Sequence, residues 1–493
     1  MKKPSLFLLI FLILATSFNL SAKNRIVQKC VNQMKKDTLF SNSVVGIMVM
    51  DSKGKCVASW NPDSPLLTAS TMKTISTGLA LQLLGPDYRF KTRIGYSGQI
   101  ENGVLNGDLY IVGGGDPTLG SKDTVAIPVD TVFSQWYKFI RAAGIVKING
   151  SIVGDDRFFE EEALPDTWSW SNIGASYGSA ASGLSFCENI QYFTFIPGEK
   201  TGEPVVMKDV YPSIPGMEYR NMLKTGISGS GDRSSYYVSD LAKVGVFKGT
   251  LGAGKESYTV DCSSKFPALM CAEEFRLFLI DKGIESNPDV KDVRSFDATD
   301  QDQLNIIGET LSPRLISIVN VTNRISNNFY AETFFKMIGK QLTGTGSYDS
   351  SVVAAKRELA KMGLSLKGYT QVDGSGLSRQ NYVSPRFFCK YFARMKEMNN
   401  FAEFIGSFPQ PGGPGTLKSV LKDADSVTKS KIHAKSGSLS NVKCYAGYVE
   451  KRDGEYDYFA ILTNNYQART SEIQAGVERF LGALVDIKET SKK

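Results

Sequence analysis

Sheet-forming sequence near both ends of this 493-residue chain constrains its fold more than any other feature. Residues 43–66 alternate apolar runs with a turn at Ser52–Gly54 and predict two strands. Residues 442–465 predict two more, and the apolar spacing of residues 471–485 predicts a closing helix. Helical patterns over residues 311–398 precede these last strands. Strands and helices at both ends indicate one α/β domain that is interrupted by an insertion.

The middle of the chain has a different pattern. From about Tyr88 to Asp300, short apolar runs are broken by glycine and aspartate, which predicts one or two inserted β-rich domains. The chain is also too long for a single ordinary core, so we expect a multi-domain α/β fold. The expected boundaries are residues 23–88 for the first part of the split domain, 89–299 for the insertion and 300–493 for the second part.

The first 22 residues have the pattern of a secretory signal peptide. Lys2 and Lys3 give a charged start, Leu6–Ala15 an apolar core, and Leu20–Ala22 a small-residue cleavage site. The apolar run is short for a membrane span, which favours cleavage over the alternative of an uncleaved anchor. We therefore expect a protein exported across the inner membrane.

Composition argues against several classes of function. The formal net charge is +7, but the basic residues are scattered and form no clustered face of the kind that binds nucleic acid. A single histidine, His433, argues against a His-rich zinc site and leaves a Ser-His-Asp triad only one candidate base. The seven cysteines contain no CxxC pair and do not make a disulfide framework. If the protein is a hydrolase, we expect its base to be a residue other than histidine.

One serine–lysine pair is placed where it could do that chemistry. Ser70 and Lys73 lie at the start of a predicted helix, residues 68–85, which follows the first two strands. A lysine one turn after a serine projects from the same helix face, and a crowded apolar site lowers its pKa enough to accept the serine proton. The spacing alone proves little, because it recurs at Ser52–Lys55, Ser419–Lys422, Ser426–Lys429 and Ser440–Lys443.

Two further motifs follow in the chain. Ser326 and Asn328 are two residues apart in a predicted tight loop, so a hydroxyl and an amide can point into one cleft. Lys435-Ser436-Gly437 leads into Ser438 and a strand, where the glycine lets backbone approach a ligand and the polar side chains can hold a carboxylate. A second tripeptide of this type, Lys224-Thr225-Gly226, precedes the Ser326 loop and is interpreted as a lookalike.

Other attractive stretches have plainer interpretations. Residues 113–122 (GGGDPTLGSK) resemble a phosphate-binding loop with its last two residues exchanged and are interpreted as a turn. The aromatic run that holds Trp168, Trp170 and Tyr177 could stack on a sugar, but packing at a domain boundary is favoured. His433, beside the third motif, is expected to flank the strand and not to act as a base.

Taken in order, these motifs resemble the serine penicillin-recognising set Ser-x-x-Lys, Ser-x-Asn and Lys-(Thr/Ser)-Gly. Longer stretches, above all VDGSGLSRQNYVSP at residues 372–385 and FPQPGGPGTL at residues 408–417, resemble the class C low-molecular-mass penicillin-binding proteins. The resemblance covers nearly the whole mature chain and is weakest at about residues 187–265. It implies a serine DD-peptidase/β-lactamase-like transpeptidase domain split by an insertion. It also implies a periplasmic D-Ala-D-Ala carboxypeptidase with DD-endopeptidase activity.

The resemblance implies a role for each motif residue. Ser70 would attack the carbonyl between the two terminal D-alanines, Lys73 would receive its proton, and Ser326 would relay a proton to the leaving amine. Asn328 would hydrogen-bond the substrate amide. The backbone N–H groups of Ser70 and Ser438 would form the oxyanion hole.

It also implies how the substrate is held. Lys435 would supply positive potential, Ser436 and Ser438 would bind the terminal carboxylate beside Gly437, and Arg379 is a candidate contact to the stem peptide. The expected partners are peptidoglycan stem peptides and, as covalent inhibitors, β-lactam antibiotics. No metal, cofactor or obligate protein partner is implied.

Two positions depart from the family pattern: Asn327 stands where aspartate is commoner, and Ser436 stands where threonine is commoner. Both substitutions keep the functional side chains at the flanking motif positions.

Two alternatives to a DD-peptidase stay open. One is a β-lactamase or esterase that uses the same site, and the other is a non-catalytic cell-wall-binding protein.

Overall fold

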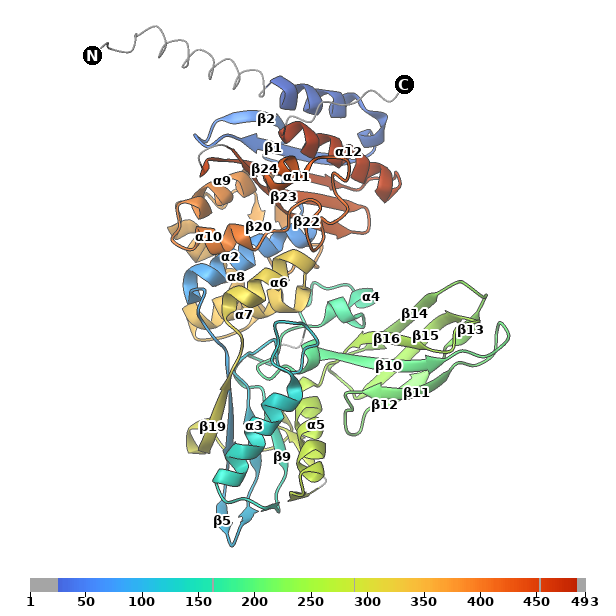
Figure 1. The fold of residues 1–493 in the computed structure, drawn as a ribbon, viewed down its shortest axis with the longest axis vertical. Helices are drawn as coiled ribbons and strands as arrows, with labels where there is room; N and C mark the ends of the chain where they lie inside the picture. Colours follow the sequence, from blue (N-terminus) through green and yellow to red (C-terminus); the bar gives the residue numbers. More distant parts are fainter. Residues whose placement is uncertain (1–24, 162–163, 288, 452–453, 486–493) are drawn as a thin grey trace, which may run out of the picture.

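The computed structural model describes residues 25–161, 164–287, 289–451 and 454–485 (Figure 1). The predicted signal peptide, residues 1–22, lies outside the described residues. Within these ranges no helix has the length and apolar character that spanning a membrane requires.

The main sheet combines the two ends of the chain. Its five antiparallel strands run in the order β2-β1-β24-β23-β22. Ile47 pairs with Ile461, so the first strand after the N-terminal helical segment lies beside the last strand of the chain. The strands are β1 (Val44–Met50), β2 (Cys56–Trp60), β22 (Ile432–Leu439), β23 (Val442–Glu450) and β24 (Tyr456–Asn464).

Both faces of this sheet are covered, because alternate residues of a strand point to opposite sides. Met48 and Met50 of β1 belong to the apolar core shared with α2 (Lys73–Leu84) and α9 (Pro385–Lys396). Ile47 and Val49 belong instead to the core shared with α12 (Thr470–Leu484). This two-sided burial explains why the sequence of β1 is an almost continuous apolar run.

A layer of helices lies under the sheet in Figure 1. Helix α2 is buried from Lys73 to Leu81 and contacts α6 and α7. The other helices of this layer are α6 (Leu315–Ile325), α7 (Asn328–Thr343), α8 (Tyr348–Lys361) and α10 (Phe401–Gly406), whereas the short α11 (Ser426–Ser430) contacts β22 of the sheet. A small sheet, β20-β21-β3, lies beside the start of α2; its strands are β3 (Leu66–Leu67), β20 (Tyr369–Thr370) and β21 (Tyr382–Val383).

The insertion contains two modules. The lower module in Figure 1 holds the sheets β18-β9-β7-β4-β19 and β17-β8-β6-β5. It also holds two long helices, α3 (Val129–Ala142) and α5 (Pro267–Asp281), which the sequence pattern did not predict in this β-rich region. Its strands are β4 (Lys91–Tyr96), β5 (Gln99–Glu101), β6 (Val104–Asn106), β7 (Leu109–Val112), β8 (Lys147–Ile148), β9 (Ile152–Asp155), β17 (Glu285–Ser286), β18 (Val290–Asp292) and β19 (Asn305–Leu311). Because β19 pairs with β4, this sheet continues past the boundary expected at residue 300.

The second module is a β-rich arm that projects to one side in Figure 1. It has two sheets, β11-β10-β16 and a four-stranded sheet centred on β15. Its elements are α4 (Trp170–Ile173), β10 (Ile190–Ile196), β11 (Val206–Tyr211), β12 (Glu218–Asn221), β13 (Lys224–Gly226), β14 (Asp232–Val238), β15 (Val244–Gly252) and β16 (Tyr258–Ser263).

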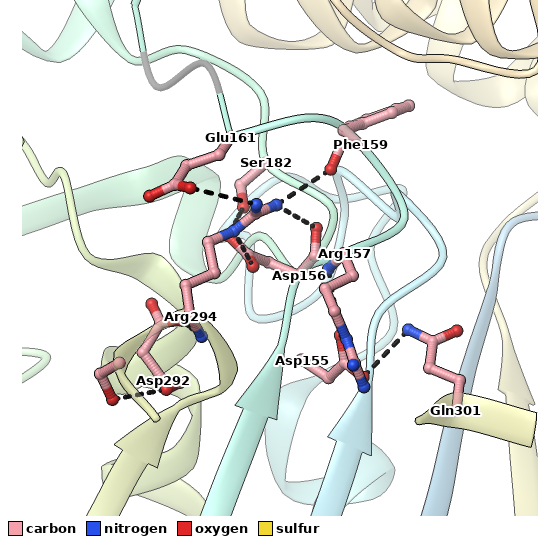
Figure 2. A network of polar contacts seen from close by, with 10 residues as sticks. Asp155, Asp156, Arg157, Phe159, Glu161, Ser182, Asp292, Arg294 and Gln301 are labelled. Atoms are coloured by element: carbon pink, nitrogen blue, oxygen red, sulfur yellow. Dashed lines mark hydrogen bonds and ion pairs between the residues drawn. The ribbon is translucent and has the colours of Figure 1, made fainter. Parts of the chain in front are cut away.

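A polar network anchors the loop that leaves the lower module toward the helical layer (Figure 2). Arg294 donates to the Asp156 carboxylate at 2.7 Å and to the backbone oxygen of Phe159 at 3.0 Å. The ring of Phe159 lies in the core under α7, with Lys336 of that helix 5.9 Å from the ring centre. The insertion is therefore fixed to the helix that begins at the second sequence motif.

Candidate active site

Ser70 lies where a short 3-10 turn, Ala69–Met72, runs into helix α2. Leu66 and Leu67 form the preceding strand β3. The φ angle of Ala69 is 44°, and this conformation turns the chain sharply into the helix. One helical turn after Ser70, the amine of Lys73 lies 2.7 Å from its hydroxyl oxygen. Ser70 is partly exposed whereas Lys73 is fully buried, so the hydroxyl can meet a substrate and the amine cannot.

The surroundings of Lys73 suit an amine that exchanges a proton. Its Nζ also lies 2.6 Å from Oδ1 of Asn328 and 2.9 Å from the backbone oxygen of Ser375. Burial lowers the pKa of Lys73 to about 7, against the opposing effect of the Glu332 and Asp373 carboxylates. A substantial fraction of Lys73 is therefore neutral near neutral pH, as a general base requires.

The second motif forms the junction between α6 and α7. Ser326 ends α6 in the left-handed conformation, with φ 66° and ψ 39°. Asn327 caps α7 by accepting a hydrogen bond from the backbone N–H of Tyr330 at 3.0 Å. Asn328 is the first residue of α7; its amide accepts from Lys73 and donates to the backbone oxygen of Tyr177 at 2.8 Å.

The third motif lies on β22, the edge strand of the main sheet. Lys435 is fully buried and donates to the hydroxyl of Ser326 and to the backbone oxygen of Ser436, both at 2.8 Å. Burial, followed by the charges of Lys73 and Lys443, holds the pKa of Lys435 well below its usual range. Ser436 donates to the hydroxyl of Thr416 at 3.0 Å.

Gly437 is needed because β22 passes very close to the Ser70 turn. A Cβ atom at this position would lie 2.8 Å from the backbone oxygen of Thr68 and 2.9 Å from the backbone nitrogen of Ser70. Contacts that short to backbone atoms do not occur in folded proteins, so any side chain would displace either the strand or the Ser70 turn.

A cleft of about 430 Å³ opens over these motifs. Arg379 lies at its rim and donates to the backbone oxygen of Ser440 at 3.0 Å. Ser438 also faces the cleft and accepts a hydrogen bond from Lys443 at 3.1 Å. The lining residues are Ser70, Ser169, Ser171, Asn172, Tyr177, Asn328, Gly376, Leu377, Arg379, Ser438, Leu439 and Ser440.

The insertion contributes directly to this cleft through the aromatic run. Trp168 is buried and donates to the carboxylate of Asp373 at 2.9 Å, as the packing interpretation expects. Trp170 and Tyr177 differ, because 58% and 51% of their respective surfaces are exposed. Tyr177 lines the cleft, so part of this run belongs to the groove itself.

Sequence reasoning missed the carboxylates behind Lys73. Glu332 of α7 is fully buried and accepts from the backbone N–H groups of Gly374 and Ser375 at 2.9 and 2.8 Å. Asp373 accepts from the N–H groups of Gly376 and of Ser378 in the same turn. Asp373 lies in a stretch that carries the family resemblance, but Lys73 is distant in sequence from both carboxylates and no local pattern predicts the interaction.

The lookalike motifs lie elsewhere in the fold. Lys224 is exposed on β13 of the arm. His433 lies on β22 but its ring contacts Gln410 and Glu450, and burial lowers its pKa. Lys122, in the stretch that resembles a phosphate loop, packs over the ring of Tyr192. Among the described residues, no group of three or more His, Cys, Asp and Glu side chains could hold a metal ion.

Comparison with known proteins places this arrangement in a family. Residues 27–484 match the model of the D-Ala-D-Ala carboxypeptidase 3 (S13) family. The chain belongs to this family. It is 26% identical over 453 residues to a D-alanyl-D-alanine carboxypeptidase of Actinomadura sp. strain R39, covering 88% of this chain and 80% of that one. It is 23% identical over 433 residues to the D-alanyl-D-alanine carboxypeptidase DacB of Haemophilus influenzae, covering 87% and 86%.

A solved structure supports the fold of this S13 chain. Penicillin-binding protein 4 of Haemophilus influenzae superposes with a TM-score of 0.77 at 22% identity, over 90% of this chain and 95% of that one. The same protein in complex with a β-lactam superposes with a TM-score of 0.72. The predicted fold class, the penicillin-binding-protein family and the assignment to serine-type D-Ala-D-Ala carboxypeptidases are confirmed.

Proposed function

We propose that this S13 protein removes the terminal D-alanine from peptidoglycan stem peptides through an acyl-enzyme on Ser70, with Lys73 as the general base. One observation supports this best: the Ser70 hydroxyl and the buried amine of Lys73 are 2.7 Å apart at the floor of an open cleft. A pKa of about 7 lets Lys73 accept the serine proton near neutral pH.

The reaction has two stages. Ser70 Oγ bonds to the carbonyl carbon of the penultimate D-alanine while its proton passes to Lys73. The oxyanion that forms would be held by the backbone N–H groups of Ser70 and Ser438. The tetrahedral intermediate collapses, the peptide C–N bond breaks, and Ser326 relays a proton to the departing amine. Water then hydrolyses the ester, which regenerates Ser70 and releases the shortened peptide.

The polar side chains on β22 would hold the substrate in register. Lys435 lies beside Ser436, and a bound terminal carboxylate would favour its charged form against the effect of burial. Ser438 faces the cleft, so these side chains together suit that carboxylate. Gly437 lets β22 lie against the Ser70 turn. Asn328 would hydrogen-bond the substrate amide, and Arg379 at the rim would contact the stem peptide farther from the scissile bond. The same contacts would admit β-lactam antibiotics as covalent inhibitors of Ser70.

We also propose DD-endopeptidase activity on cross-linked stem peptides, because two of the residues that line the cleft, Tyr177 and Arg379, are exposed. The signal-like N-terminal sequence supports a periplasmic location, where such peptides are found. Mass spectrometry of muropeptides after incubation would show loss of terminal D-alanine for the first activity and conversion of dimers to monomers for the second. Fractionation of cells would test the location.

Labelling by a fluorescent penicillin tests the nucleophile. Ser70→Ala should abolish covalent labelling and D-alanine release, whereas Ser419→Ala, an exposed serine with the same spacing to a lysine, should retain both. Labelling that persists in Ser70→Ala would refute the assignment. Fast turnover of penicillin without D-alanine release would indicate a β-lactamase, and wall binding without any acyl-enzyme would indicate a non-catalytic protein.

A further inference from the structure

A half-buried glutamate of the insertion, Glu188, reaches the second motif. Cys187, Glu188 and Asn189 have φ angles of 51°, 55° and 53°, so three successive non-glycine residues adopt the left-handed conformation. This conformation is costly for such residues and persists only where surrounding contacts enforce it. Here Cys187 N–H donates to the backbone oxygen of Leu119, and the amide of Asn189 donates to the backbone oxygen of Ala180.

The turn directs the Glu188 carboxylate at helix α7. Its Oε2 accepts from Nδ2 of Asn327 at 2.7 Å, and its Oε1 accepts from the hydroxyl of Ser121 at 2.6 Å. The Ser121 hydroxyl lies 3.1 Å from the phenol oxygen of Tyr330. Two loops of the insertion and the first turn of α7 therefore share one polar network. Glu188 and Asn327 are 139 residues apart in the sequence.

These contacts fix the orientation of the Asn327 amide. With Nδ2 directed at the carboxylate, Oδ1 is left to accept from the N–H of Tyr330 and cap the helix. The opposite orientation would set the amide oxygen against the carboxylate and the amide hydrogens against an N–H donor. Ser326 precedes this residue and Asn328 follows it, so the cap positions both functional side chains of the motif.

We propose that Glu188 is a positioning residue for catalysis, which orients Asn327 and thereby holds Ser326 and Asn328 in place. The proposal rests on the proposed function for its kinetic consequences. It also explains why asparagine stands at the centre of this motif. An aspartate at position 327 would set a second carboxylate against Glu188, whereas asparagine supplies the donor that Glu188 requires.

Other ionisable groups face Glu188 from the neighbouring elements. Asp123 follows Ser121 on one loop, Tyr192 lies on β10, Tyr330 lies on α7, and the Cys187 thiol is adjacent in the chain. Lys122 follows Ser121 in the chain, but its amine packs over the Tyr192 ring. Burial raises the pKa of Glu188, and its hydrogen bonds from Ser121 and Asn327 oppose that effect.

The test is a double-mutant cycle that compares the wild type, Glu188→Gln, Asn327→Asp and the double variant. The measured quantity is the rate of acylation by a labelled penicillin. Asn327→Asp should acylate about tenfold more slowly than the wild type at about pH 8.5, because two ionised carboxylates would repel. Toward about pH 6 the deficit should shrink, since one carboxyl then keeps its proton and donates. Glu188→Gln should stay close to the wild type, since its amide can accept from Asn327 and donate to Ser121.

The double variant should recover most of the wild-type rate at high pH, because the glutamine amide can donate to the new aspartate. Glu274→Gln is the matched control: Glu274 is also partly buried in the insertion, but its carboxylate accepts from Ser213 and touches no motif residue. Combined with Asn327→Asp, Glu274→Gln should not restore the acylation rate.

Three outcomes would overturn the coupling: an Asn327→Asp variant as fast as the wild type at all pH values, a deficit that does not vary with pH, or no recovery in the double variant. A wild-type protein that is not labelled would refute the proposed function instead. In that case the free energies of unfolding of the same four proteins would test the coupling between Glu188 and Asn327. If the two side chains interact, the change in the double variant must differ from the sum of the two single changes.

Discussion

The amine of Lys435 lies 2.8 Å from the hydroxyl of Ser326, which joins the edge strand of the main sheet to the junction of α6 and α7. Residues from three separate parts of the chain thus meet at one point, because Lys73 makes the corresponding contact from α2 to Asn328. The two buried amines contact different residues of the second motif. Each holds one of its functional side chains.

Removal of the Lys435 amine should therefore impair acylation strongly. We expect Lys435→Ala to slow labelling by penicillin on the order of 10²-fold, since positive potential at the carboxylate and the contact to Ser326 are lost together. Stopped-flow or gel-based labelling would measure the rate. Lys224→Ala removes an exposed lysine from the lookalike tripeptide on β13 and should leave the rate unchanged. Equal rates for the two variants would contradict a role for Lys435.

The pH dependence of acylation should report Lys73. Only the neutral amine accepts the Ser70 proton, and burial lowers the pKa of Lys73 to about 7. The rate should therefore rise as pH increases through about 7 and level off above it. A lysine with the ordinary pKa would instead give a rate still rising near pH 10. Measurement of the second-order acylation rate across this range distinguishes the two.

The sequence predicted those parts of the molecule that rest on local patterns. The strand pair around Ser52–Gly54, the helix after Ser70 and the last two strands all form as expected, because apolar runs between turn residues mark the strands and a helical period of apolar residues marks the helix. The missed helix α3 also has such a period, with Val132, Trp136 and Ile140 buried on one face. The frequent short strands around it hid that signal.

The supports of the site could not be predicted in this way. Glu332 faces the turn at Gly374 and Ser375, and Glu188 faces Asn327 from another module. Neither contact has a sequence spacing that a pattern could reveal, because each depends on how distant elements pack. The motif residues could be predicted because the chemistry restricts their type and order, and the structure brings residues of all three motifs into contact.

Any side chain at position 437 should damage the site by displacement. Gly437→Ala would set a Cβ atom against backbone atoms of Thr68 and Ser70, which cannot move without shifting the nucleophile. We expect acylation to fall at least about tenfold, with a lower melting temperature, since overpacking typically costs about 1–3 kcal/mol. Gly406→Ala is the matched control, because no neighbouring side chain or loop lies within 4 Å of the place that its added methyl group would take. Wild-type acylation by Gly437→Ala would show that the strand can move away freely.

Loss of the Glu332 charge should shift the proton affinity of Lys73. Burial and the neighbouring Asp373 raise the pKa of Glu332, whereas its hydrogen bonds from Ser375 and Gly374 oppose that effect. In its ionised form Glu332 stabilises the Lys73 ammonium ion, so Glu332→Gln should lower the pKa of Lys73 and move the rising part of the acylation profile to lower pH. The variant should also be less stable by about 1–3 kcal/mol, because the glutamine amide would direct hydrogens at the N–H groups of Gly374 or Ser375. Glu478→Gln is a suitable control, because Glu478 likewise accepts a backbone hydrogen bond, from Leu421, but lies on α12. It should leave the acylation profile in place. A profile for Glu332→Gln that is unchanged, or displaced to higher pH, would exclude Glu332 as the group that raises the pKa of the base.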